Sequence, residues 1–142
     1  MSKSSIVCVD ASVVLKRILV PDDEPVKKQW LSWDSQQVQI VAPTLLYYEV
    51  TNGLYRQQKN GLLSPEIVRD SLELALSMPI QLINEIGLHQ RAREIATKYK
   101  LPATYDAHYL ALADGMGIEF WTADLRLLNT VKPYKLVWIK GI

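Results

Sequence analysis

Short apolar runs alternate along the chain with longer stretches in which apolar residues recur at helical spacing. The runs predict strands, and the longer stretches predict the helices that connect them. Five strands are expected, at residues 5–9, 38–41, 80–83, 118–121 and 136–139. Helices are expected at residues 11–19, 26–33, 44–59, 64–77, 88–99 and 104–116. Such alternation predicts an α/β fold with a central, mainly parallel sheet of about five strands.

Several helix ends carry their own signals. Asn60 and Gly61 are a typical C-terminal pair after the third helix, and Gly117 is suited to end the last one. Ser64 is placed to cap the fourth helix, with Pro65 at the favoured first helical position. Repeats, low-complexity tracts and linkers are absent from the sequence, so residues 1–142 are expected to form a single domain.

Composition narrows the picture only slightly. The chain has 142 residues, 49% of them apolar, and a net charge of +1, which is too small to indicate a nucleic-acid or membrane partner. The single cysteine, Cys8, lies in an apolar run and is interpreted as a core residue. Asp10 interrupts the apolar stretch near the N-terminus, and no run approaches about 18 apolar residues, so a cytoplasmic protein without a signal peptide or membrane span is expected.

Candidate chemistry comes from four acidic residues that the fold should bring to one edge of the sheet. Asp10 and Asp124 follow predicted strands, and the carboxyl ends of parallel strands are where open α/β sheets bind ligands. Asp106 lies in the first turn of a helix for which Thr104 is the expected N-cap. Glu49 lies inside a helix on which Asn52 and Arg56 are expected to share its face. Clustered carboxylates without basic partners predict a divalent metal site.

Each acid taken alone also has an ordinary explanation. An aspartate is favoured as an N-cap or in a first helical turn, and a lone glutamate on a helix is most often solvated. The case for a site therefore depends on all four acids reaching the same edge, with small or hydroxylated neighbours beside the three aspartates.

The ordered set of motifs resembles PIN-domain proteins, and most closely the VapC-type toxins of toxin-antitoxin pairs. The similarity extends along the whole chain and includes residues 9–12 (VDAS), Pro43 with residues 49–52 (EVTN), residues 105–113 (YDAHYLALA) and residues 122–127 (TADLRL). The resemblance implies a three-layer α/β/α PIN fold and a Mg²⁺- or Mn²⁺-dependent endoribonuclease acting on RNA. It also implies a homodimer that a cognate antitoxin protein holds inactive. Housekeeping RNA-processing PIN proteins share these acids and stay an alternative.

The resemblance also assigns roles to residues. It implies that Asp10, Glu49, Asp106 and Asp124 are the catalytic metal-site acids, with Ser12, Asn52 and Thr122 as polar support.

Chemistry argued without the family leads to the same ions. Hard cations such as Mg²⁺ prefer oxygen ligands, and a phosphodiester needs an activated water and charge relief during hydrolysis. The hypothesis is that Asp10, Asp106 and Glu49 hold the main ion directly or through water, while Asp124 orients the attacking water or completes a second site.

Other residues support weaker interpretations. Among five basic residues that could meet RNA phosphates, Lys16, Arg17, Arg56, Lys59 and Arg126, the two favoured are Arg56 and Arg126. Trp30 and Trp33 are interpreted as core, and packing or a dimer contact is favoured over base stacking for Tyr47, Tyr48 and Tyr55. A metal-free ribonuclease using His89 and His108 is disfavoured, because both are expected to lie away from Asp106.

Other protein classes compete with the nuclease. A receiver domain needs adjacent acids after its first strand, and a haloacid-dehalogenase-like phosphatase needs an aspartate where Ser12 stands. A catalytically silent RNA- or protein-binding module on the same fold ranks next after the nuclease, although it has no reason to crowd four carboxylates together.

Overall fold

A sheet of five parallel strands forms the centre of the structure, a computed structural model that describes residues 5–142. The strands are β1 (Ile6–Val9), β2 (Gln39–Pro43), β3 (Ile80–Ile83), β4 (Glu119–Thr122) and β5 (Ile139–Gly141), and they lie in the order β3-β2-β1-β4-β5. All four pairings are parallel, with Val9 opposite Trp121 between β1 and β4.

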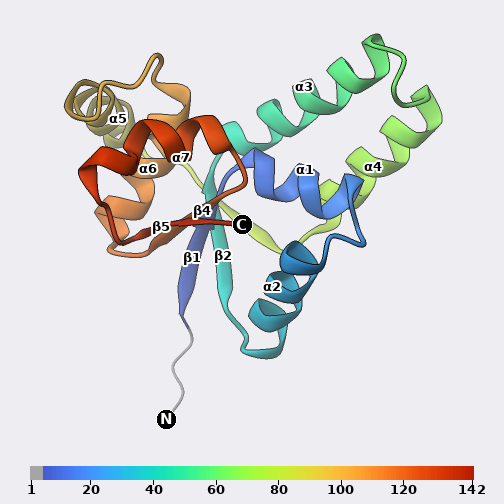
Figure 1. Ribbon diagram of the computed structural model, residues 1–142, viewed down its shortest axis with the longest axis horizontal. Coiled ribbons are helices and arrows are strands. Elements are labelled where there is room, and N and C mark those ends of the chain that lie inside the picture. Colours follow the sequence, from blue (N-terminus) through green and yellow to red (C-terminus); the bar gives the residue numbers. More distant parts are fainter. Residues whose placement is uncertain (1–4) are drawn as a thin grey trace.

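Within the described residues, seven α-helices and one short 3-10 helix connect these strands. They are α1 (Ala11–Leu19), α2 (Glu24–Ser35), α3 (Leu45–Lys59), α4 (Pro65–Ser77), α5 (Gly87–Lys98), α6 (Tyr105–Met116), α7 (Leu125–Val131) and η1 (Lys132–Tyr134). Figure 1 shows α1 to α4 on one side of the sheet and α5, α6 and α7 on the other.

The chain order explains these two helical layers. From β1 through β2 to β3 the strands are added in one direction, and from β3 through β4 to β5 they are added in the opposite direction. Since parallel crossovers are right-handed, reversing the direction moves the connecting helices to the other face. The predicted three-layer α/β/α sandwich is therefore confirmed, and the sheet is entirely parallel.

The core fills the space between the sheet and both helical layers. Phe120 in β4, Leu110 in α6 and Val14 in α1 are all fully buried, and each such side chain contributes about 1.5–3 kcal/mol through burial. Trp30 and Trp33 are also buried and pack edge to face, with their ring centroids 5.2 Å apart, so their interpretation as core is confirmed. Cys8 is likewise fully buried.

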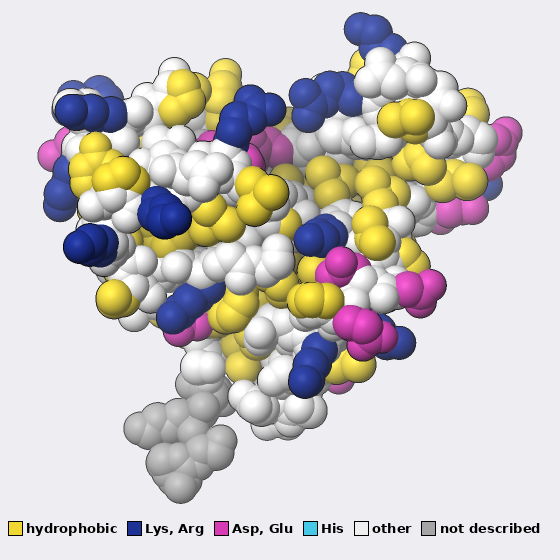
Figure 2. Space-filling view, in the orientation of Figure 1, with side chains coloured by type: hydrophobic (Ala, Val, Ile, Leu, Met, Phe, Trp, Pro, Cys, Tyr) yellow, Lys and Arg dark blue, Asp and Glu magenta, His cyan; other side chains and the backbone are white. Residues whose placement is uncertain are grey.

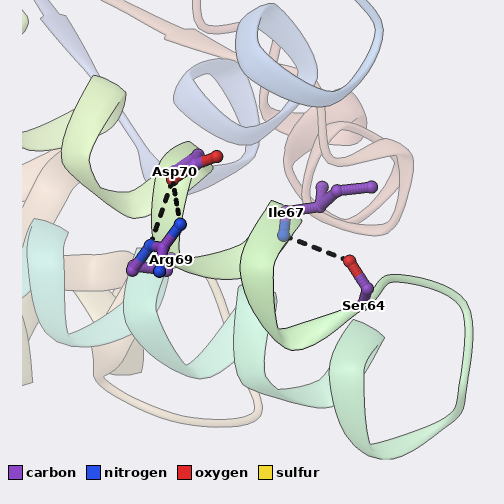
Figure 3. Close-up of polar contacts among 4 residues, drawn as sticks. All are labelled: Ser64, Ile67, Arg69 and Asp70. Atoms are coloured by element: carbon purple, nitrogen blue, oxygen red, sulfur yellow. Dashed lines mark hydrogen bonds and ion pairs between the residues drawn. The ribbon is translucent and has the colours of Figure 1, made fainter.

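The helix-end signals of the α3–α4 hairpin are confirmed. α3 ends at Lys59, followed by Asn60 and by Gly61 with a positive φ of 74°, and α4 begins at Pro65. Figure 3 shows the Ser64 hydroxyl accepting a hydrogen bond from the Ile67 backbone N–H, at 3.2 Å. The same view shows the exposed Arg69–Asp70 ion pair, which contributes little because both groups are solvated.

The C-terminal part differs from expectation. No helix was expected at residues 125–131, where α7 forms, and the last strand was expected at residues 136–139 but runs over Ile139–Gly141. A parallel connection must return to the amino edge of the sheet before pairing begins, and residues 132–138 make that return. Leu136 and Trp138 were assigned to the strand from their apolar character, but they pack against the core from this return segment.

Two wider predictions meet the structure only in part. None of the helices between residues 5 and 142 is long and apolar enough to cross a bilayer. The single domain predicted over residues 1–142 includes residues 1–4, which lie outside the described residues, and it stays a prediction.

Candidate active site

Asp10 is the most buried acid in the described chain, with 4% of its surface exposed. It follows β1 and caps α1, because its Oδ1 accepts a hydrogen bond from the Val13 backbone N–H at 3.3 Å. The hydroxyls of Ser12 and Thr122 also donate to this carboxylate, each at 2.5 Å. The pairing of β1 with β4 places Thr122 beside Asp10, so the sheet itself builds this contact.

The two hydroxyls connect Asp10 to the segment that carries Asp124. The Ala123 backbone N–H donates to the Ser12 hydroxyl at 2.8 Å, and the Asp124 backbone N–H donates to the Thr122 hydroxyl at 3.0 Å. The expectation that Ser12 and Thr122 are polar support therefore has a structural basis: they fix the Asp10 carboxylate and the chain leaving β4.

Asp124 caps α7 as well as facing the other acids. Its Oδ1 accepts hydrogen bonds from the backbone N–H groups of Arg126 and Leu127, at 2.9 and 3.4 Å. One carboxylate oxygen meets these N–H groups, and the side chain still lines a cleft with the other three acids. Capping therefore does not exclude Asp10 and Asp124 from a site, and their role in one stays a prediction.

Glu49 is held by a contact that the sequence interpretation missed. The hydroxyl of the fully buried Tyr109 donates to Glu49 Oε1 at 2.6 Å, joining α6 to α3. Tyr109 lies three residues after Asp106 and so shares its face of α6. That spacing was the available signal for a contact with the acids, but a tyrosine in an apolar helix is usually interpreted as a core residue.

Asp106 lies in the first turn of α6, as predicted, but its helix is not capped as predicted. Thr104 occupies the N-cap position with helical backbone angles, and its side chain makes no capping hydrogen bond in the described structure. Its carbonyl oxygen accepts a hydrogen bond from a ring nitrogen of His108 instead. This residue cannot point its hydroxyl at the free N–H groups, because capping requires an extended N-cap backbone.

The four acids line one cleft at the carboxyl edge of the sheet, with a volume of about 190 Å³. They come from different elements: the end of β1, α3, α6 and the segment after β4. Figure 2 shows acidic side chains in a hollow between α7 and the α3 arm, with Lys or Arg side chains on its rims. The described lining is Asp10, Ala11, Ser12, Leu15, Glu49, Gly53, Arg56, Asp106 and Asp124.

Burial and mutual repulsion raise the pKa values of three of these acids. Burial is the main reason that the pKa of Asp10 rises from 3.8 to about 7, against the lowering effect of its hydrogen bonds, and Asp106 adds to the rise. Burial also raises the pKa of Glu49 and that of Asp106, with smaller contributions from Asp106 and Asp124 respectively. The cleft therefore concentrates negative charge that a cation would stabilise.

The donor set fits a hard divalent cation that keeps water ligands. Every acid here offers only oxygen, and the ion pairs of residues 5–142 are Arg69–Asp70 and Arg91–Glu85, so none of the four acids has an ion-pair partner. In the same residues, no three His, Cys, Asp or Glu side chains converge tightly enough to enclose an ion on their own. Mg²⁺ commonly uses one or two carboxylates and several waters, which this spacing accommodates.

The remaining predicted residues are divided between the cleft and its surroundings. Arg56 lines the cleft with Glu49, but Asn52 lies in a neighbouring recess because Gly53, four residues after Glu49, takes the position facing the acids. Arg126 is exposed on α7, where its backbone contacts Asp124. The roles of Asn52 and Arg126 stay predictions.

The two histidines lie together in a recess that none of the four acids lines. His89 and His108 hydrogen-bond to each other between α5 and α6, and both line a separate recess. This placement agrees with the expectation that they do not serve the acidic cleft.

Comparison with known proteins identifies the family. The PIN domain profile matches residues 7–133, a span that contains all four acids. The chain belongs to the PIN-domain family. This PIN domain is 29% identical over 124 residues to Ribonuclease VapC9 of Mycobacterium tuberculosis and to a VapC ribonuclease of Mycobacterium bovis, covering 87% of this chain and 90% of each relative. The resemblance drawn from the motifs is thereby confirmed.

Solved structures share the fold of this PIN domain. VapBC2 from Rickettsia felis, bound to a promoter DNA fragment, superposes with a TM-score of 0.73 at 12% identity, covering 96% of this chain and 98% of that one. PAE2754 from Pyrobaculum aerophilum gives a TM-score of 0.67 at 20% identity, covering 92% and 87%. A toxin-antitoxin complex from Klebsiella pneumoniae gives 0.58 at 20% identity, covering 88% and 90%.

Proposed function

We propose that this PIN domain is a Mg²⁺- or Mn²⁺-dependent endoribonuclease, the toxin of a toxin-antitoxin pair. The observation that carries the proposal is the cleft that Asp10, Glu49, Asp106 and Asp124 line together, without a basic ion-pair partner in the described residues. A stable protein gains nothing from this repulsion unless a cation is bound there. Relatives named VapC ribonuclease support RNA as the substrate.

The chain's own residues would prepare the cleft for this chemistry. Asp10, Asp106 and Glu49 would hold the cation directly or through water, and Asp124 would orient the attacking water or hold a second ion. A divalent cation bound there supplies activation of that water and charge relief on the phosphoryl oxygens. Ser12, Thr122 and Tyr109 keep the carboxylates oriented through their hydroxyl hydrogen bonds.

Substrate would approach over the basic rim of the cleft. Arg56 already lines the cleft, and its guanidinium suits the paired oxygens of a phosphate. Arg126, exposed on α7, is the second candidate for a phosphate contact.

The cellular context follows from the same proposal. We infer a cytoplasmic protein that forms a homodimer, as the family resemblance implies. A cognate antitoxin would hold it inactive, and two fold neighbours, VapBC2 and a toxin-antitoxin complex, support that partner. An RNA-processing PIN nuclease without an antitoxin has the same site chemistry, and the neighbouring gene distinguishes the two.

Cleavage of a labelled single-stranded RNA tests the activity. Wild-type protein should cut with Mg²⁺ or Mn²⁺ and not with EDTA, and Asp106→Asn should lose activity at least 100-fold while melting normally. Asp114→Asn makes the same change at an exposed position on α6 and should cut like wild type.

The products and the metal dependence separate the alternatives. A water nucleophile can leave a 5′-phosphate, whereas attack by the ribose 2′-OH leaves a 2′,3′-cyclic phosphate. Binding of RNA that is equal in EDTA and in Mg²⁺, with no cleavage in either, would instead support a silent binding module.

A further inference from the structure

A second recess lies beside the acidic cleft, at the same edge of the sheet. It begins where β2 and β3 end, at Pro43 and Ile83, and has a volume of about 290 Å³. Small-molecule sites occupy roughly 300–1,000 Å³, so this recess suits one small planar group. We call it the side pocket. Its aromatic and polar lining includes Tyr48, Asn84, Glu85, His89, Tyr105 and His108.

Two helices connect the side pocket to the acidic cleft. Tyr48 precedes Glu49 on α3, and Tyr105 precedes Asp106 on α6. Consecutive residues of a helix point about 100° apart, because a turn contains 3.6 residues. Each helix therefore presents an acid to the cleft and a tyrosine to the side pocket.

The two tyrosines are unusually exposed for aromatic side chains. Tyr48 is 76% exposed and Tyr105 is 61% exposed, although most large aromatic rings of a folded domain are largely buried. Proteins that read single-stranded RNA stack its splayed bases on such rings. A ring pair beside a phosphodiester-cleaving site is suited to hold the neighbouring base.

The polar groups of the side pocket can meet the edge of a base. The His108 Nδ1–H must donate to the Thr104 carbonyl oxygen at 2.6 Å, since a carbonyl only accepts. In neutral His108 the Nε2 then accepts from His89 Nδ1–H at 3.0 Å, which leaves His89 Nε2 as an acceptor.

Two further polar groups line the side pocket. Asn84 adds an amide, which can donate and accept, and Glu85 is paired with Arg91 at 2.7 Å, which reduces its repulsion of RNA.

We propose that the side pocket binds one unpaired RNA base next to the phosphodiester in the acidic cleft, with Tyr105 and Tyr48 stacking on it. This inference rests on the proposed function, because the cleft supplies the phosphodiester. Tyr105 is the cleaner probe, since Tyr48 also lines the neighbouring recess with Tyr47 and Tyr55.

Binding of a fluorescent single-stranded RNA tests the pocket. The full chain carries Asp10→Asn to stop cleavage, and binding is measured in Mg²⁺. Adding Tyr105→Ala should weaken binding by roughly 5- to 150-fold, the range of single stacking contacts, and Tyr105→Phe should stay within about twofold. Tyr55→Ala is the matched control, because Tyr55 is 53% exposed and lies outside the side pocket, and it should bind like the parent.

A double-mutant cycle connects Tyr105 to one base. A single abasic nucleotide is moved along the RNA until binding to the parent protein falls. At that position the abasic RNA should bind the parent and the Tyr105→Ala variant about equally, because the stacking partner is already gone. Thermal melting checks that each variant is folded.

The outcomes separate the two proposals. If metal-dependent cleavage is observed but Tyr105→Ala binds intact RNA like its parent, the side-pocket proposal is wrong and the nuclease proposal stands. Equal loss with intact and abasic RNA, or a changed oligomeric state without any base dependence, would also contradict it and assign Tyr105 to folding or to a protein interface. If the wild type neither binds nor cuts RNA, both proposals fail.

Discussion

At the scale of single residues, two carboxylates of the site also stabilise the fold, because Asp10 and Asp124 cap helices. Asp10 caps α1 and is held by two hydroxyls, which fixes its position more tightly than a surface acid. Its remaining negative charge is the part that the fold does not compensate. Asp10 therefore stabilises α1 as its cap, while burial and the nearby Asp106 disfavour its negative charge.

The raised pKa of Asp10 predicts a pH dependence in metal-free protein. Since burial raises this pKa from 3.8 to about 7, the folded state keeps a proton that the unfolded chain releases. The contribution to stability is complete below about pH 3.8 and is lost as the pH rises through about 7. The free energy of unfolding of wild type minus that of Asp10→Asn, measured by urea titration in EDTA, should therefore fall by a few kcal/mol over this window. A difference independent of pH would contradict the account.

Tyr109 provides a second residue-level test. Tyr109→Phe removes the hydroxyl that orients Glu49 and keeps the packed ring, so stability should fall by about 1 kcal/mol. Metal affinity should fall roughly 10-fold, as for other groups that orient ligands, and this is measured by calorimetric titration of Mn²⁺. Tyr47→Phe is the control, because it removes a 2.9 Å hydrogen bond to the Ala75 carbonyl outside the cleft. An unchanged Mn²⁺ affinity in Tyr109→Phe would show that the Tyr109 hydroxyl does not orient Glu49 for metal binding.

At the scale of elements, helix ends could be predicted where residues typical of caps mark them. Whether a capping hydrogen bond forms depends on the backbone angles, which the sequence does not show. Ser64 and Pro65 predicted the start of α4, and Gly117, with φ of 67°, ends α6 as expected. Thr104 occupies the predicted N-cap position of α6, but its backbone is helical and its hydroxyl makes no capping hydrogen bond. Propensity identifies residues that are able to cap, but only the tertiary path sets the backbone angles that allow it.

The short α7 shows the same limit for a whole element. Asp124 is a typical N-cap residue, and Leu127 and Val131 are buried and four residues apart, which is helical spacing. The sequence therefore contained a signal for this helix. Seven residues carry too little periodicity to separate a helix from a loop, and burial against the core decides the outcome. Leu136 and Trp138 misled in the opposite direction, because they pack against the core from outside the strand.

Asp124 allows the capping and charge roles to be separated at the start of α7. Asp124→Asn keeps an oxygen acceptor for the Arg126 and Leu127 N–H groups, whereas Asp124→Ala removes it. Stability should fall by about 1 kcal/mol in the alanine variant and stay near wild type in the asparagine variant. RNA cleavage should be lost in both, because both remove the charge. An asparagine variant with full activity would assign Asp124 to capping only.

At the scale of the whole molecule, the sheet order turns scattered acids into one site. β1 and β4 are neighbours at the centre of the sheet, so the residues after them meet where the strand order reverses. This rule made the meeting of Asp10 and Asp124 predictable from sequence, and the helix positions of Glu49 and Asp106 allowed them to join the same edge. It could not predict that Gly53 would displace Asn52 from the cleft, because that depends on the rotation of α3 against α1.

Thermal melting in EDTA, Mg²⁺ and Mn²⁺ is the most direct test of the acidic cleft as a metal site, since an ion that binds only the folded protein must stabilise it. At 100 times its Kd the ion should add about 2.7 kcal/mol, a rise in Tm of roughly 5–10 °C. The account predicts this rise for the wild type and for Asp114→Asn, and a much smaller rise for Asp106→Asn. If millimolar metal leaves the Tm of each of the three proteins unchanged, the metal site is contradicted. The aspartates would then act only as helix caps.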